Sequence, residues 1–193
     1  MKKMLSVVLT AVLLVSGMSV NAVPKVSADS DILEPKASNT YRQYLLDTDE
    51  KSFSGREIVI EAKDYIRASE EADVQVAEKF NGKSNVLLWN GLGGTVEWEI
   101  QVPEDSLYCI ETTYYVLNPD ARNVEFGLSV DGKKPFDMAA NIELPRMFRS
   151  AEDIVADSRG NDIRPDQEPY DIWVSESLRD NSGVFNEPYR FYF

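Results

Sequence analysis

The chain has 193 residues, with 20 basic and 33 acidic residues, one cysteine and no histidine. The formal net charge of −13 argues against nucleic acid or anionic lipid as a partner, because both need clustered lysine and arginine side chains facing phosphate. The lack of histidine removes Ser-His-Asp and Cys-His nucleophile pairs in their common form, and with them the commonest transition-metal ligand.

The first segment has the features of a secretory signal peptide. Lys2 and Lys3 precede an apolar run from Met4 to Val15, and two small-residue cleavage sites follow, Val20-Asn21-Ala22 and Val26-Ser27-Ala28. A membrane anchor is the alternative, but it needs about 20 apolar residues. We therefore predict that residues 1–28 are removed and that the protein is secreted, extracellular and associated with the cell surface. The mature charge would then be 17 − 33 = −16, because residues 1–28 hold three of the basic residues and no acidic one.

Residues 29–56 are predicted to form a flexible leader with one short helix. Within Tyr41–Leu46, helical spacing places Tyr41, Tyr44 and Leu45 on one side. A helix this short is marginal alone, so it must dock or fray. The stretch Glu57–Ala62 is β-branched and predicts the first strand of a β domain that covers residues 57–193.

The next segment ends in a glycine-rich loop. We expect a short strand at 74–77, a turn at Asn81-Gly82 and a strand at Val86–Trp89, followed by the loop Asn90–Gly94. A phosphate-binding loop would need a helix after it, so that backbone N–H groups and the helix dipole converge on the anion. A strand follows instead, and this argues against nucleotide binding.

The stretch from residue 95 to residue 132 predicts an antiparallel meander. Apolar and polar residues alternate through 95–102, 107–117 and 124–130, the pattern of strands with one buried face, and Trp98 falls on that face. Asp131-Gly132 is a strong hairpin signal. Cys109 lies in the second strand, which predicts a small buried thiol, with an intermolecular bridge as the alternative. The fold class is therefore all-β, an antiparallel β-sandwich.

The remaining residues are less regular. Residues 145–170 predict a long loop that carries several arginines, and loops of this length tend to be functional or disordered. Asp157–Asp162 lacks the residue order of a calcium loop, so we interpret it as an acidic turn with arginine partners. Residues 172–174 predict a short strand. Tyr189–Phe193 alternates as a strand should, but no pairing partner for it is evident.

The sequence offers few catalytic candidates. It has no Gly-x-Ser-x-Gly, Cys-x-x-Cys or Walker-type motif, and its many acids do not single out a carboxylate pair for glycoside hydrolysis. We therefore predict that the protein is not an enzyme. Trp89, next to Asn90 and a glycine loop, suits a sugar that stacks on the ring while its hydroxyls bond to the amide. The alternative, that Trp89 plugs the end of the sandwich, is equally open.

Several stretches together resemble a known family: residues 58–65, 94–103, 107–108 and 130–133 are similar to the β-sandwich carbohydrate-binding modules of families six and thirty-five. The likeness covers residues 57–193. Later stretches, at 135–136, 146–148, 159–165 and 186–193, resemble the version found at the front of large solute-binding proteins of sugar ABC transporters in Gram-positive bacteria.

The resemblance implies a jelly-roll fold of the galactose-binding-domain type with a sugar cleft between two aromatic rings. By position, the rings are Trp89 and Phe148, with Asn90 beside them. The family often binds structural calcium at its first strand, where Glu61 is retained but the second acid is replaced by Lys63. It also continues beyond Phe193 with closing strands, so the resemblance implies a sandwich that lacks its last strands. Because an uncovered edge leaves unpaired backbone groups and exposes apolar side chains, we expect the chain to be poorly soluble or molten alone.

Together these features predict a secreted, non-catalytic carbohydrate-binding module, the front part of a sugar-uptake solute-binding protein. Its partners would be an oligo- or polysaccharide, a downstream solute-binding domain and transporter permeases. A structural or interaction domain of the same fold without a sugar site is the main alternative. A glycoside hydrolase fragment is the third.

We expect no cofactor and no stabilisation by calcium. Lys63 places an ammonium group where a second carboxylate would bind the metal, so it repels the cation and removes an oxygen ligand. Thermal unfolding with millimolar calcium should match unfolding without it. A rise in melting temperature on adding calcium, reversed by a chelator, would contradict this expectation.

Overall fold

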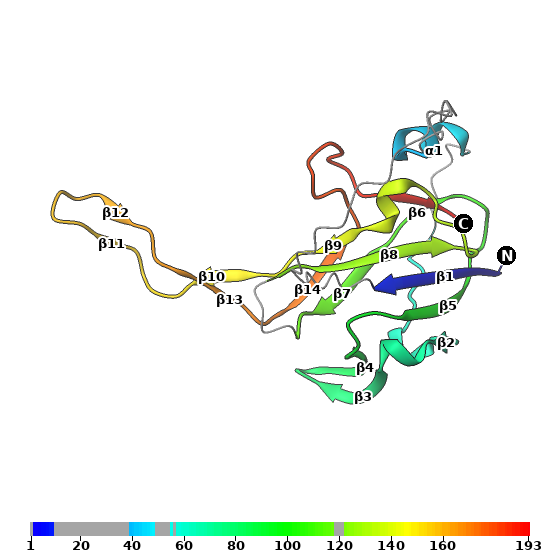
Figure 1. Ribbon diagram of the computed structural model, residues 1–193, viewed down its shortest axis with the longest axis horizontal. Helices are drawn as coiled ribbons and strands as arrows, with labels where there is room; N and C mark the ends of the chain where they lie inside the picture. Colours follow the sequence, from blue (N-terminus) through cyan, green and yellow to red (C-terminus); the bar gives the residue numbers. More distant parts are fainter. Residues whose placement is uncertain (1, 10–38, 49–54, 56, 118–121) are drawn as a thin grey trace, which may run out of the picture.

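The computed structural model describes residues 2–9, 39–48, 55, 57–117 and 122–193 (Figure 1). Within 2–9 it describes the backbone and the side chain of Lys3. The described part consists mostly of β-strands with one short α-helix, so the predicted all-β class is confirmed. The proposed signal cleavage sites and most of the predicted leader lie outside the described residues.

The largest sheet contains five antiparallel strands in the order β2-β5-β1-β8-β9. These are β2 (Arg67–Ala68), β5 (Thr95–Gln101), β1 (Lys2–Leu9), β8 (Val124–Val130) and β9 (Ile142–Leu144). The middle strand thus comes from the segment that the sequence predicts to be a removable signal peptide.

The other strands pair two by two, all antiparallel. The pairs are β3 (Val74–Phe80) with β4 (Lys83–Trp89), β6 (Leu107–Cys109) with β15 (Arg190–Tyr192), β7 (Glu111–Tyr115) with β14 (Trp173–Ser177), β10 (Phe148–Ser150) with β13 (Gln167–Pro169), and β11 (Val155–Ala156) with β12 (Asp162–Ile163). The helices are α1 (Tyr41–Asp47) and the 3-10 turns Ala62–Asp64, Glu70–Ala72 and Asp137–Ala140.

The predicted meander is present, with one change in its second strand. β5 and β8 match the predicted strands, and Asp131 and Gly132 have the positive φ angles, 50° and 72°, of a hairpin turn. The predicted strand 107–117 is split at Ile110, whose carbonyl oxygen accepts from the Leu178 N–H at 2.9 Å. The chain changes pairing partner there, from β15 to β14.

Several local predictions are wrong, and three of them concern single segments between α1 and β14. Glu57–Ala62 does not form a strand, and the first strand after α1 is β2. Cys109 is exposed and not buried, because it ends β6 at the point where the chain leaves β15. Residues 145–170 are not a loop: β10–β13 and β11–β12 form an arm, yellow to orange in Figure 1, that extends away from the rest of the described chain.

The predicted helix is present as α1, and it docks by its tyrosines. The Tyr41 ring lies 4.7 Å from Phe136 and 4.9 Å from Tyr189, centroid to centroid. The Tyr41 hydroxyl accepts from the Arg190 N–H at 2.9 Å. Such contacts stabilise a helix of seven residues, which would be marginal in water alone.

The expectation that Tyr189–Phe193 has no pairing partner is wrong. β15 pairs with β6, Phe193 exchanges two backbone hydrogen bonds with Ser106, and α1 covers the rings of this segment. Its alternating aromatic residues enter a core that also includes residues of β5, β8 and β9. Trp98 packs against the edge of this core, half-buried, and its indole N–H donates to the Ala62 carbonyl oxygen at 3.1 Å.

A buried carboxylate organises the turn before β15. The Asp180 side chain accepts hydrogen bonds from the Ser182 N–H and hydroxyl and from the N–H groups of Val184 and Phe185, at 2.7–3.0 Å. Burial, the largest influence, raises the pKa of Asp180, but these hydrogen bonds together outweigh it and hold the pKa below its usual range. The turn places the Phe185 ring 5.0 Å from the ring of Tyr41.

We expect Asp180→Asn to lower the free energy of unfolding at pH 7 by about 1–3 kcal/mol, because an amide cannot accept all four hydrogen bonds. A folded-state pKa below the unfolded value means that the stabilisation is complete above about pH 3.9 and is lost as the pH falls through the folded pKa. Urea unfolding at pH 7 and pH 3 should therefore show a smaller pH effect in the variant.

The matched control is Asp157→Asn at the tip of the arm. Asp157 caps a similar turn, with bonds from Asn161 and Arg159, but it lies in solvent. Its replacement should change stability much less. Equal losses for the two variants would show that burial of Asp180 is not what makes its hydrogen bonds important.

Candidate binding surface

The β7–β14 ribbon carries the most promising surface for a ligand. Because side chains alternate across a strand, each cross-strand pair shares one face. Tyr114, paired with Val174, is buried, and its hydroxyl donates to the Pro145 carbonyl oxygen at 2.9 Å. Burial, and next the charge of Glu176, raises the pKa of Tyr114 to about 12. The opposite face holds the pairs Tyr115–Trp173, Thr113–Ser175 and Glu111–Ser177.

Three half-buried aromatic rings meet at one end of this face. The Phe80 ring lies 5.4 Å from Tyr115 and 6.2 Å from Trp173, and the Tyr115 and Trp173 rings are 5.5 Å apart. The Trp173 indole N–H donates to the Asn81 carbonyl oxygen at 2.9 Å. The cluster therefore joins the β3–β4 hairpin to the ribbon and leaves part of each ring open to solvent.

The predicted turn at Asn81-Gly82 explains how the hairpin reaches the ribbon. Both residues have positive φ, 42° and 85°, which suits a two-residue hairpin turn that follows the twist of its strands. Phe80 and Lys83 thus pair directly across the turn. The Lys83 ammonium lies 5.3 Å from the centroid of the Trp173 ring, so one cation already contacts this ring.

Hydroxyl groups lie next to the rings. The hydroxyl oxygens of Thr113 and Ser175 are 2.7 Å apart, and both side chains are exposed. Each hydroxyl can donate one hydrogen bond and accept two, so the pair keeps capacity for a ligand. The exposed Glu111 carboxylate follows, about 7 Å further along the strand. This face offers a cluster of aromatic rings packed edge to face and then directed polar groups.

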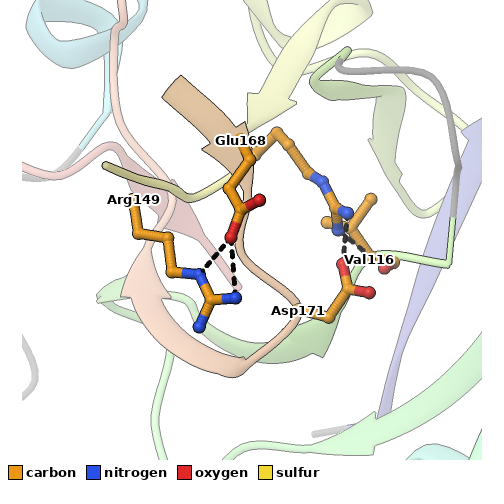
Figure 2. A network of polar contacts seen from close by, with 5 residues as sticks. Val116, Arg149, Glu168 and Asp171 are labelled. Carbon is orange, nitrogen blue, oxygen red and sulfur yellow. Dashed lines mark hydrogen bonds and ion pairs between the residues drawn. The ribbon is translucent and has the colours of Figure 1, made fainter. Parts of the chain in front are cut away.

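A buried arginine holds the end of the ribbon. Arg146 is 7% exposed and donates to the Val116 carbonyl oxygen at 2.8 Å and to the Asp171 carboxylate (Figure 2). The backbone N–H of Arg146 donates to the side-chain oxygen of Asn123 at 2.9 Å. Val116 directly follows β7 and Asp171 lies shortly before β14, so this contact fixes the strand ends that carry Tyr115 and Trp173.

The arm has its own cross-strand ion pair. Arg149 on β10 and Glu168 on β13 pair in register, with 2.7 Å between nitrogen and oxygen, and Figure 2 shows them beside the Asp171 contact. Both side chains are largely exposed, so this pair adds little stability. The Arg149 guanidinium also lies 5.1 Å from the centroid of the Tyr170 ring.

The residues of the predicted sugar cleft lie in two places. Trp89 ends β4, half-buried, and its indole N–H donates to the Gly93 carbonyl oxygen at 3.2 Å. The exposed Asn90 donates twice to the Asp73 carbonyl oxygen. Phe148, 43% exposed, begins β10 on the arm, and Figure 1 shows β4 and β10 in separate parts of the described chain. The structure therefore keeps Trp89 and Asn90 together but does not bring Phe148 to them.

The residues considered for calcium lie in and beside the 3-10 turn Ala62–Asp64. Glu61 is exposed, and Lys63 forms an ion pair with Asp64 at 3.3 Å. Asp157 caps a turn as predicted, but its partners are Asn161 and the Arg159 backbone, not arginine side chains. Within the described segments, no group of three or more Cys, Asp or Glu side chains is placed to hold a metal ion.

One pocket lies away from the ribbon, beside α1. Its volume is about 500 Å³, and its lining consists of Arg42, Leu45, Leu46, Leu107, Phe185 and Arg190. The polar side chains in this lining are two guanidinium groups, which donate hydrogen bonds and accept none. The pocket therefore suits an anion with an apolar part better than a neutral polar ligand.

The ribbon surface was not identified from the sequence. The Asn81-Gly82 turn and a strand around Trp173 were expected, but which strand Trp173 pairs with depends on the register across 58 residues.

Comparison with protein-family models, curated proteins and solved structures finds no match for this chain. In the part of the chain that the structure describes, no helix is long and apolar enough to cross a membrane.

We expect Arg146→Ala to lower the free energy of unfolding by about 2–3 kcal/mol, because it removes charge-assisted hydrogen bonds and leaves the Val116 carbonyl and Asp171 without their donor. It should also speed proteolysis within the arm. Arg149→Ala is the matched control and should change stability by less than about 0.5 kcal/mol. Equal effects in urea unfolding would contradict the role assigned to Arg146.

Proposed function

We propose that this protein is a secreted, non-catalytic carbohydrate-binding protein with a β-sandwich fold of the jelly-roll type. We propose that it is related to the carbohydrate-binding modules of families six and thirty-five. We also propose that it forms the front part of a sugar-uptake solute-binding protein. The single observation that carries it is the face of β7–β14 on which a cluster of half-buried aromatic rings is followed by a pair of exposed hydroxyls.

The chemistry of this surface matches that of a sugar. A sugar ring has a C–H face that stacks on an aromatic ring and hydroxyls that need directed donors and acceptors. Tyr115 and Trp173 supply the first, and Thr113 and Ser175 supply the second. The strongly acidic composition favours a neutral or cationic ligand over an anionic one. A neutral saccharide meets both conditions.

Lys83 covers the Trp173 ring, and we expect a ligand to displace it. Its ammonium lies over the Trp173 ring, on an exposed side chain. A sugar that stacks on this face would displace the ammonium, which then donates hydrogen bonds to sugar hydroxyls instead. This exchange keeps the lysine satisfied in both states.

Asp157 and Asp180 are not candidates for a general acid. Such a group needs a raised carboxyl pKa, whereas hydrogen bonds hold the pKa of each of these two carboxyl groups below its usual range. Both serve to cap turns, and neither lies on the β7–β14 face.

An interaction domain is the second candidate, and the arm favours it. A two-stranded ribbon is at best marginally stable alone, and this arm exposes apolar side chains, such as Ile154 at 65% and Val155 at 57%. A neighbouring domain that covers the arm would bury them. This function would place binding on the arm and leave the β7–β14 face without a role.

Affinity electrophoresis on a panel of neutral polysaccharides tests the proposal with matched tryptophan variants. If the β7–β14 face binds sugar, Trp173→Ala should lose retention, and Trp89→Ala should keep it. The double variant Thr113→Val with Ser175→Ala leaves every ring in place. It should weaken retention by about tenfold or more, because hydroxyls of the bound sugar lose their hydrogen-bond partners on the protein. Circular dichroism melts confirm that each variant is folded.

The opposite pattern would place the site elsewhere. Loss of retention in Trp89→Ala alone would move the sugar to the end of β4, where the sequence places it. Retention that is absent for the unmodified protein on every polysaccharide, or unchanged in all three variants, would reject carbohydrate binding. Hydrolysis of a retained polysaccharide would overturn the non-catalytic assignment.

A further inference from the structure

The middle strand of the largest sheet comes from the segment predicted to be cleaved. β1 pairs with β5 from Lys2↔Gln101 to Val8↔Thr95, and with β8 from Leu5↔Val130 to Leu9↔Phe126. Figure 1 shows it between these two strands. The inference below rests on the proposed secretion, because cleavage after residue 28 would remove this strand from the mature protein.

Without β1, strands β5 and β8 cannot pair with each other as they stand. Each lies one strand spacing from β1, so they are about 9.6 Å apart, twice the spacing of ~4.8 Å between paired strands. Backbone N–H and C=O groups on both inner edges would lose their partners, which is costly where water is excluded. Val96 and Leu128, both buried, border this position on either side.

Removal of β1 would leave a slot between β5 and β8, and the residues of these two strands define which strand can fill it. Alternate positions of the middle strand lie opposite apolar residues of β5, namely Val96, Trp98 and Ile100, and the positions between them lie opposite Glu97 and Glu99. An occupant therefore needs apolar residues at alternate positions, as β1 has with Leu5 and Val7. The positions between accept either kind, because β1 places Met4 opposite Glu99 and Ser6 opposite Glu97. It must also run antiparallel to both neighbours, as β1 does.

The charge around the slot adds a further condition. The Lys3 ammonium lies 3.2 Å from the Asp131 carboxylate, and its side chain is only 17% exposed. Removal of residues 1–28 takes this lysine away and leaves the chain with a net charge of −16. A basic residue near the end of the occupant that lies beside Asp131 would replace the lost ion pair.

We propose that the mature protein is a strand acceptor: the slot between β5 and β8 binds one extended strand of a partner polypeptide, with alternating apolar residues and a basic residue beside Asp131. Backbone hydrogen bonds to both neighbours supply the affinity, and the alternating side chains supply the register. In the precursor, residues 2–9 hold this position themselves.

Peptide exchange into the full chain tests the proposal. A site for a specific protease is placed within residues 10–28, the folded chain is cut there, and a fluorescent peptide of residues 2–9, KKMLSVVL, is added. Fluorescence anisotropy should show saturable binding as the labelled strand replaces the cut one. A scrambled peptide of the same composition that moves the apolar residues away from positions 5, 7 and 9 should not bind, because these positions lie opposite apolar residues of β5 and β8.

Two variants test the geometry. The peptide with Ser6→Pro should bind about tenfold more weakly or worse, because proline removes a backbone donor within a central strand. The peptide with Lys3→Glu should bind severalfold more weakly, and Asp131→Asn in the protein should remove most of that difference. Asparagine suits this position because residue 131 has φ of 50°.

The contrary outcomes are equally definite. Equal binding of the proline and unmodified peptides, or no exchange at all, would overturn the strand-acceptor proposal. A dimer of cut protein by light scattering, with its slot closed to peptide, would show a second copy as the occupant and also overturn it. Mass spectrometry of the secreted protein tests cleavage separately: a chain that keeps residues 2–9 would make β1 permanent. Sugar retention is measured independently of all these outcomes.

Discussion

A cluster of aromatic rings holds together parts of the chain that are far apart in the sequence. Tyr41 on α1 contacts Phe136, Phe185 and Tyr189, and Phe136 in turn contacts Phe191 on β15. The Tyr41 and Tyr44 hydroxyls accept hydrogen bonds from backbone N–H groups of β15, so each tyrosine is held both by ring contacts and by its hydroxyl. Without this cluster neither the seven-residue helix nor the short strand β15 would be stable, because each has too few local contacts.

The same need for tertiary support governs the smaller sheets. All the sheets of the described chain except the five-stranded one are two-stranded, and such ribbons are marginal in water alone. The β7–β14 ribbon is held at one end by Arg146 and by the aromatic contact with the β3–β4 hairpin. These supports position Tyr115 and Trp173, so the stability of the ribbon and the shape of the proposed binding surface have one cause.

The two proposals use different physical features and different parts of the molecule. Sugar binding depends on side chains of the ribbon, where rings and hydroxyls stand in sequence along one face. Strand binding depends on the backbone edges of β5 and β8, which side-chain changes on the ribbon leave intact. A partner strand would lie beside Ile100 and Leu128, which belong to the core that α1 and β15 also line.

Periodicity in the sequence determined the all-β class, strands β5 and β8, the Asn81-Gly82 and Asp131-Gly132 turns and the short helix α1. Each depends on residues close in the chain, where alternation and turn chemistry act directly. The split of the strand at Ile110, the exposure of Cys109 and the arm at 145–170 were missed, because pairing partners decide them.

The candidate surface was decided almost entirely by the tertiary structure. Trp89 and Asn90 are adjacent in sequence and remain together, whereas Phe148 is carried away on the arm. Trp173 meets Tyr115 and Phe80 only through a register set across the chain. The use of residues 2–9 as a middle strand was likewise hidden, since an apolar run has the same composition in a leader and in a buried strand. Local sequence specifies what a segment can form, and only the long-range pairing of its backbone selects its neighbours.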